Sequence, residues 1–130
     1  MKKVYLAGQP NKYESNWKKA FRGIEGFDFY DPEIDSDQTS SVTFFPQDLQ
    51  AIEDADILVA NPGIAPAEAT WIEIGYFLKK DTTKPGETSK NLIMVWKDER
   101  EPKWSIEFVK KAGKIVNTVE EAVIELQNLA

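Results

Sequence analysis

The sequence predicts an α/β protein in which helices cover both faces of a parallel sheet. Short runs of strand-forming residues alternate along the chain with stretches of helical periodicity, and such alternation is typical of parallel sheets. The segment 91–96 is apolar from its second residue onward, as expected of a strand buried on both faces. Turn residues follow the predicted strands at 8–10 and 61–63. At 130 residues the chain has the size of one domain, so we expect a single domain over residues 1–130.

Five strands are expected from short runs rich in β-branched and aromatic residues. The first of these runs ends at Gly8, and the second is stopped by Asp31 and Pro32. The predicted strands occupy residues 4–7, 27–30, 57–60, 91–96 and 114–116.

The helices between them are expected from apolar spacing and from capping residues. Thr118 and Glu121 form a capping box for the last helix, and Gly26 suits the C-cap of the first. Pro46 is expected to start a short helix. The predicted helices occupy residues 11–26, 46–53, 65–80, 104–113 and 118–129.

Residues 31–45 are polar and irregular, so the sequence predicts a long loop there. Phe44 and Phe45 end this segment. Either the segment is a lid that docks over a pocket, or it is an insertion whose two phenylalanines rejoin the core.

Five strands alternating with helices suggest a flavodoxin-like, doubly wound sheet in three α/β/α layers. Ligands of such sheets bind beyond the carboxyl ends of the strands, where the strand order reverses. Three segments are expected to meet at that edge, namely 8–10, 31–48 and 61–73.

The composition excludes several kinds of chemistry. The chain has no cysteine and no histidine, which removes thiolate catalysis, the usual zinc ligands and the Ser-His arrangement. Its net charge of −6 argues against a nucleic-acid polymer as partner. No apolar run approaches the ~20 residues of a membrane span, and the start lacks the cleavage site of a signal peptide. We therefore expect a cytoplasmic protein without a membrane partner, whose acid–base chemistry uses carboxylates, tyrosine or lysine.

Glu73 is the first candidate for chemistry, because it lies among apolar residues near the start of a predicted helix: Ile72, Ile74, Tyr76, Phe77 and Leu78. The helix N-terminus favours the charged carboxylate, whereas apolar neighbours oppose it. Opposed influences of this kind are typical of a nucleophile or an acid–base group. The alternative is an acid that caps the helix or pairs with a lysine.

Asp48 lies in the short helix that leads to the third strand. Either the helix dipole stabilises this carboxylate, or it is a second catalytic acid that faces Glu73. Two carboxyl groups in different environments are what cleavage of a glycosidic bond requires. Two other residues have open roles. Tyr5 either presents its hydroxyl to the pocket or only packs, and Glu68 either caps its helix or binds a sugar hydroxyl.

Several motifs together resemble the nucleoside 2-deoxyribosyltransferase family, in particular its short deoxyribosyltransferase-like branch. The resemblance covers most of residues 3–80. It is carried by Tyr-Leu-Ala-Gly in the first strand, Trp17, the Asp-Leu to Ala-Asp segment of 48–56, and Glu-Ile-Gly-Tyr at 73–76.

This resemblance implies roles for individual residues. Glu73 corresponds to the nucleophile, and Asp48 to the acid that assists protonation of the leaving base or orients the sugar. Residues expected to bind substrate are Tyr5, Gly8, Gln9, Asn61, Glu68 and Thr70. The sequence departs from the family pattern at two places. Ala69 stands where glycine is common, and Ala67 occupies the place of a further sugar-binding acid, with Glu68 one position away.

The implied reaction is a double displacement on a 2′-deoxynucleoside through a deoxyribosyl-glutamate intermediate, after which a free nucleobase accepts the sugar. It needs no metal and no organic cofactor, and the resemblance implies a homo-oligomer. Two alternatives remain. One is an N-glycosidase that hydrolyses 2′-deoxynucleoside 5′-monophosphates, with a phosphate at the backbone N–H groups of residues 8–11. The other is a non-catalytic module that binds nucleosides or nucleotides.

Overall fold

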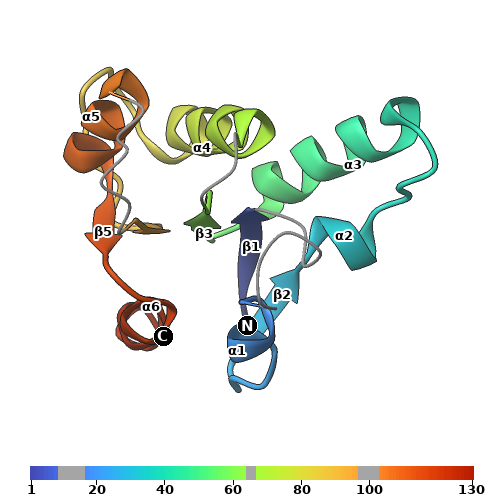
Figure 1. Cartoon of the computed structure of the whole chain (residues 1–130), viewed down its shortest axis with the longest axis horizontal. Helices are drawn as coiled ribbons and strands as arrows, with labels where there is room; N and C mark the ends of the chain where they lie inside the picture. Colours follow the sequence, from blue (N-terminus) through green and yellow to red (C-terminus); the bar gives the residue numbers. More distant parts are fainter. Residues whose placement is uncertain (9–16, 64–66, 97–102) are drawn as a thin grey trace.

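The computed structural model describes residues 1–8, 17–63, 67–96 and 103–130. Five parallel strands form one sheet in the order β2-β1-β3-β4-β5 (Figure 1). This order confirms the predicted flavodoxin-like sheet. The strands are β1 (Lys2–Gly8), β2 (Phe27–Tyr30), β3 (Ile57–Asn61), β4 (Leu92–Val95) and β5 (Lys114–Val116).

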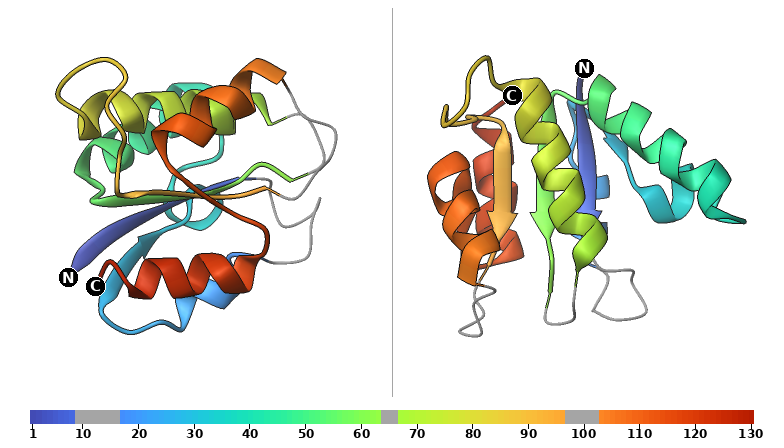
Figure 2. Two further views of the ribbon diagram at one scale, coloured as in Figure 1. Left: turned by 90° about the vertical axis from the view of Figure 1, so that its left-hand side faces the viewer. Right: turned by 90° about the horizontal axis from the view of Figure 1, so that it is seen from above.

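Helices cover both faces of the sheet, which completes the three predicted layers. Figure 2 shows α3, α4 and α5 along one face and α1 and α6 along the other. The helices are α1 (Lys19–Arg22), α2 (Pro32–Asp35), α3 (Ser41–Asp54), α4 (Glu68–Asp81), α5 (Lys103–Ala112) and α6 (Val119–Gln127). In the described part of the chain, no helix is both long and apolar enough to cross a membrane.

Each strand contributes to two separate cores, because successive side chains of a strand point to opposite faces. In β1, Val4 and Leu6 join the core under α1 and α6. Tyr5 and Ala7 join the core under α3, α4 and α5. Tyr5 therefore lies on the same side of the sheet as the two helices that hold Asp48 and Glu73.

The prediction of a long irregular loop over residues 31–45 is wrong. Asp31 accepts a hydrogen bond from the backbone N–H of Glu33 and so caps α2, with Pro32 at its first position. Helix α3 already begins at Ser41, and Pro46 lies inside it. The proline ring removes one backbone donor. Pro46 lies in the N-terminal half of α3, and the N-terminal end of this helix projects beyond the sheet in Figure 1. Phe45 is 54% exposed, so it does not join the core.

The first predicted helix is only partly described, since residues 11–16 lie outside the described ranges. Its described part, α1, ends at Arg22, with Gly23 rather than Gly26 as its C-cap. Gly26 instead adopts a φ of 92°, a left-handed conformation that suits glycine, in the turn that leads to β2.

Candidate active site

The sheet reverses its strand order between β1 and β3, whose carboxyl ends are Gly8 and Asn61. These two residues are register partners. A Cβ atom on Gly8 would lie 2.4 Å from the carbonyl oxygen of Asn61 and 2.7 Å from the ring of Trp17. Only glycine allows the chain to pass so closely at this position. The switch point is therefore tightly packed around Gly8. The predicted role of Gly8 in substrate binding stays a prediction.

Glu73 and Tyr5 meet directly beside this switch point. Glu73 lies in the second turn of α4 and is partly buried, and the side chain of Tyr5 is fully buried. The Tyr5 hydroxyl donates a hydrogen bond to Oε2 of Glu73. The hydroxyl of Tyr5 thus contacts Glu73 while its side chain packs in the core, and a role of Tyr5 in substrate binding stays a prediction.

Burial raises the pKa of Glu73 to about 7, and the nearby charge of Asp48 acts in the same direction. The hydrogen bond from Tyr5 and the positive charge of Lys18 oppose this rise, because both favour the carboxylate. Glu73 thus changes its protonation state near neutral pH, which suits a group that reacts as a carboxylate in a site with little solvent.

The apolar residues beside Glu73 in sequence do not all surround it in space. Ile74 and Phe77 are buried against the sheet, whereas Ile72 and Tyr76 are 61% and 39% exposed. Each helix position turns about 100° from the previous one, so neighbours in sequence point to different sides. The expectation that Glu73 lies among all of these apolar side chains is therefore wrong for Ile72 and Tyr76.

Asp48 lies on α3 and is partly buried. One of its hydrogen-bond donors comes from β2, whereas the donor to Glu73 comes from β1. The Tyr30 hydroxyl donates a hydrogen bond to Oδ1 of Asp48 over 3.3 Å. Burial raises the pKa of Asp48, and hydrogen bonds from Ser36 and Tyr30 and the charge of Lys18 oppose the rise. The charge of Asp48 raises the pKa of Glu73, so the two predicted carboxylates lie within electrostatic reach of each other.

A buried ion-pair cluster lies beneath this site. Lys18 is only 2% exposed, and its Nζ lies 2.7 Å from Oδ1 of Asp31 and 3.8 Å from Oε1 of Glu33. Arg22 also bonds to Asp31. Because Asp31 caps α2, the cluster holds that helix at the carboxyl end of β2. It also places a positive charge where it favours the ionised forms of Asp48 and Glu73.

Sequence reasoning missed Tyr30, Lys18 and Ser36. Lysine is rarely buried, so nothing in the pattern marked Lys18. Tyr30 ends an aromatic strand and was indistinguishable from a core residue. The Asp-Pro pair at 31–32 was the available signal for α2, because such a pair is a frequent helix start.

The remaining predicted site residues differ in how far they are described. Thr70 and Asn61 are buried, with 4% and 7% exposed. Glu68 is exposed at the first position of α4, which agrees with an acid in the first turn. Gln9 lies outside the described residues. The substrate-binding roles of these residues stay predictions.

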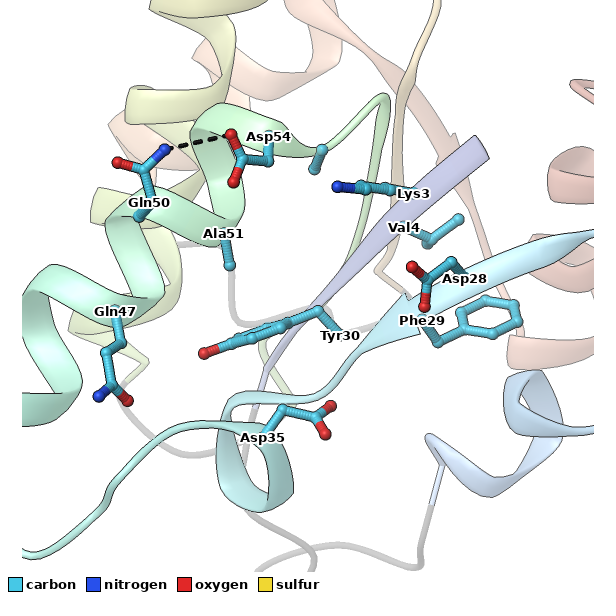
Figure 3. Close-up of a pocket in the computed structure, with 11 residues that line it drawn as sticks. Lys3, Val4, Asp28, Phe29, Tyr30, Asp35, Gln47, Gln50, Ala51 and Asp54 are labelled. Carbon is cyan, nitrogen blue, oxygen red and sulfur yellow. Dashed lines mark hydrogen bonds between the residues drawn. The ribbon is translucent and has the colours of Figure 1, made fainter. Parts of the chain in front are cut away.

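A groove of about 480 Å³ runs between β2 and α3, on the outer side of Tyr30. Figure 3 shows the Tyr30 ring reaching from β2 toward α3, with Asp35 and Gln47 nearby. Glu73 and Asp48 do not line this groove. Within the described ranges, no group of three or more acidic side chains is arranged to hold a metal ion.

The fold and the site define an α/β protein with two carboxyl groups at the switch point of a parallel sheet. The sequence matches no protein-family model and no curated protein sequence. Among solved structures, the chain resembles a CMP N-glycosidase from Clostridium botulinum with a TM-score of 0.68 and 20% identity, over 99% of this chain and 100% of that one. It also resembles a 2-deoxyribosyltransferase from Leishmania mexicana with a TM-score of 0.55 and 20% identity, over 75% of this chain and 66% of that one. The chain therefore has the nucleoside 2-deoxyribosyltransferase-like fold.

Proposed function

We propose that this protein cleaves the N-glycosidic bond of 2′-deoxynucleosides and transfers the sugar to another nucleobase. The observation that carries the proposal is the placement of Glu73, which is bonded to Tyr5 and lies near Asp48 at the switch point. The fold supports it, since both structural neighbours are named as enzymes that act on this kind of bond.

In the proposed reaction, a carboxylate oxygen of Glu73 attacks C1′ of the sugar, and the bond between C1′ and the base nitrogen breaks. The base leaves with the electron pair of that bond and takes a proton with the help of Asp48. Glu73 is then esterified to the sugar. In the second half, a nitrogen of the acceptor base attacks C1′, Glu73 leaves as a carboxylate, and Asp48 helps to remove the proton. The carboxyl groups perform every step, so the proposal includes no metal and no cofactor.

Tyr5 contributes by holding one oxygen of Glu73, which leaves the other oxygen available for attack. Because Glu73 must be ionised to attack, and burial raises its pKa to about 7, kcat/KM is expected to fall as the pH drops below 7.

The decisive experiment follows exchange of the sugar between bases. The protein is incubated with a 2′-deoxynucleoside and a different free base, and the expected result is a new deoxynucleoside in the chromatogram. A slowly reacting fluorinated deoxynucleoside should leave one sugar residue on Glu73, located by peptide mass mapping. Glu120→Gln on the exposed face of α6 is the control and should react as the wild type does. Sugar attached to another residue would contradict the mechanism.

Hydrolysis of nucleoside 5′-monophosphates is a second candidate, favoured by one observation. The CMP N-glycosidase aligns with nearly the whole chain, whereas the deoxyribosyltransferase aligns with three quarters of it. In this case water, rather than a second base, takes the sugar from Glu73. Parallel assays on a deoxynucleoside, on its monophosphate and on CMP, each with and without an acceptor base, distinguish transfer from hydrolysis.

We further propose that the protein forms at least a dimer and acts in the cytoplasm. The projecting N-terminal end of α3 supports the proposal of a dimer. Val42 and Phe45 are 81% and 54% exposed there, within an uncharged stretch over residues 38–47. A low content of charged residues and a high content of aromatic residues are typical of the cores of protein–protein interfaces.

Light scattering tests the dimer with matched variants. The wild type is expected to be dimeric or larger, and Phe45→Ser is expected to shift it toward the monomer by removing apolar contact. Phe108→Ser removes an equally apolar side chain that is 74% exposed on α5, and it should leave the assembly unchanged. A monomeric wild type would refute the proposal.

A further inference from the structure

We propose that Tyr30 is a positioning residue of this site. Its hydroxyl orients Asp48, and its ring, stacked on Tyr5, fixes the tyrosine that holds Glu73. This inference takes the chemical roles of the two carboxyl groups from the proposed function. The positioning of the two groups by the tyrosines does not depend on that function.

The two tyrosines form a pair on the sheet. Tyr5 and Tyr30 are register partners on the neighbouring strands β1 and β2. Their ring centroids are 5.5 Å apart, and the ring planes differ by 16°. This is the separation of stacked aromatic rings. Tyr5 has no exposed surface, so rotation of either ring is restricted by the other.

From this pair the two hydroxyls reach different helices. Tyr5 donates to Glu73 on α4, and Tyr30 donates to Asp48 on α3. Figure 3 shows the hydroxyl end of Tyr30 directed toward α3. The two carboxyl groups are therefore connected through the sheet by one stacked pair, although they belong to separate helices.

Both tyrosines act as donors at neutral pH. Burial raises the pKa of Tyr30 to about 12, and burial together with the negative charge of Glu73 raises the pKa of Tyr5. Neither hydroxyl ionises in the range where the carboxyl groups titrate. The other groups that act on Asp48 or Tyr30 are Lys18, Ser36 and Asp35, and Ser36 hydrogen-bonds to both Asp48 and Tyr30.

Two kinds of variant separate the hydroxyl from the ring. Tyr30→Phe keeps the stack and removes the donor to Asp48. A hydrogen bond to the charged form lowers the pKa of a carboxyl group. The pKa of Asp48 should therefore rise by about half to one unit in Tyr30→Phe, while that of Glu73 changes little. Tyr30→Met removes the aromatic ring as well, which releases Tyr5 and should move the titration of both carboxyl groups.

The experiment is a carboxyl carbon NMR titration of the full chain, with signals assigned by their loss in Asp48→Asn and Glu73→Gln. Tyr76→Phe, which removes a hydroxyl from the outer side of α4, is the matched control and should shift neither signal. Tyr30→Leu serves as a second aliphatic replacement if Tyr30→Met does not fold. In the exchange assay, kcat of Tyr30→Phe should fall about threefold to tenfold, as expected for loss of one hydrogen bond.

An unchanged Asp48 midpoint in Tyr30→Phe overturns the role of the hydroxyl. A Glu73 midpoint that stays unchanged in the folded aliphatic variant overturns the role of the ring. Because the titrations need no substrate, shifted midpoints without any sugar exchange would contradict the proposed function and leave the positioning role supported.

Discussion

Glu73→Gln is expected to abolish sugar transfer and, at pH 8, to make the protein more stable. Glutamine has the same shape and its amide oxygen still accepts the hydrogen bond from Tyr5, but it cannot form the ester with C1′. Loss of the proposed nucleophile should lower kcat for the proposed transfer by at least about a thousandfold.

The gain in stability follows from the raised pKa of Glu73. A carboxyl group whose pKa is about 7 when folded and 4.5 when unfolded binds protons more tightly in the native state. The contribution of Glu73 to the stability therefore falls as the pH rises from about 4.5 to about 7, and it levels off above that. A rise of about 2.5 in pKa corresponds to at most about 3 to 4 kcal/mol. Glutamine carries no charge and avoids this cost.

Urea unfolding at pH 4.5 and at pH 8 measures the effect. The difference between Glu73→Gln and the wild type should be small at pH 4.5 and should favour the variant at pH 8. Glu120→Gln, at an exposed position, controls for the general effect of removing a negative charge. Equal destabilisation of Glu73→Gln at both pH values would show that folding does not raise the pKa of Glu73.

Gly8→Ala is expected to destabilise the protein by about 2 to 3 kcal/mol, because overpacking of this kind forces the backbone to move. The new Cβ would lie 2.4 Å from the backbone carbonyl oxygen of Asn61. The contact cannot be relieved by rotating a side chain, since β1 and β3 are held in register at that point. Transfer activity should fall as well, because Gly8 lies at the switch point.

Gly75→Ala is the matched control for this variant. Gly75 lies within α4, and a Cβ there would meet no atom of the described structure within 4 Å. Alanine in an exposed helix is more favourable than glycine by about 1 kcal/mol, so Gly75→Ala should stabilise the protein. Urea unfolding of both variants gives the comparison. A Gly8→Ala variant as stable as the wild type would show that the strands separate there without cost.

The fold class followed from the sequence because strand runs and helical periodicity are local properties. All five strands lie close to their predicted positions. Helix α2 and the early start of α3 were missed, since polar residues over 31–41 have no strong period and the proline at 46 pointed to a helix start. The Asp31 cap and the surrounding ion pairs stabilise that segment through contacts with Lys18 and Arg22.

In the candidate site, too, some features follow from the sequence and others depend on the tertiary structure. Sequence alone limited acid–base chemistry to carboxylates, tyrosine or lysine, since the chain lacks histidine and cysteine, and it marked Glu73 and Asp48 as candidates. Only the tertiary structure decided what holds them. Tyr5 and Tyr30 lie 25 positions apart in the sequence but side by side in the sheet. Their stacking and their bonds to two helices depend on strand register and helix packing, which no local pattern records.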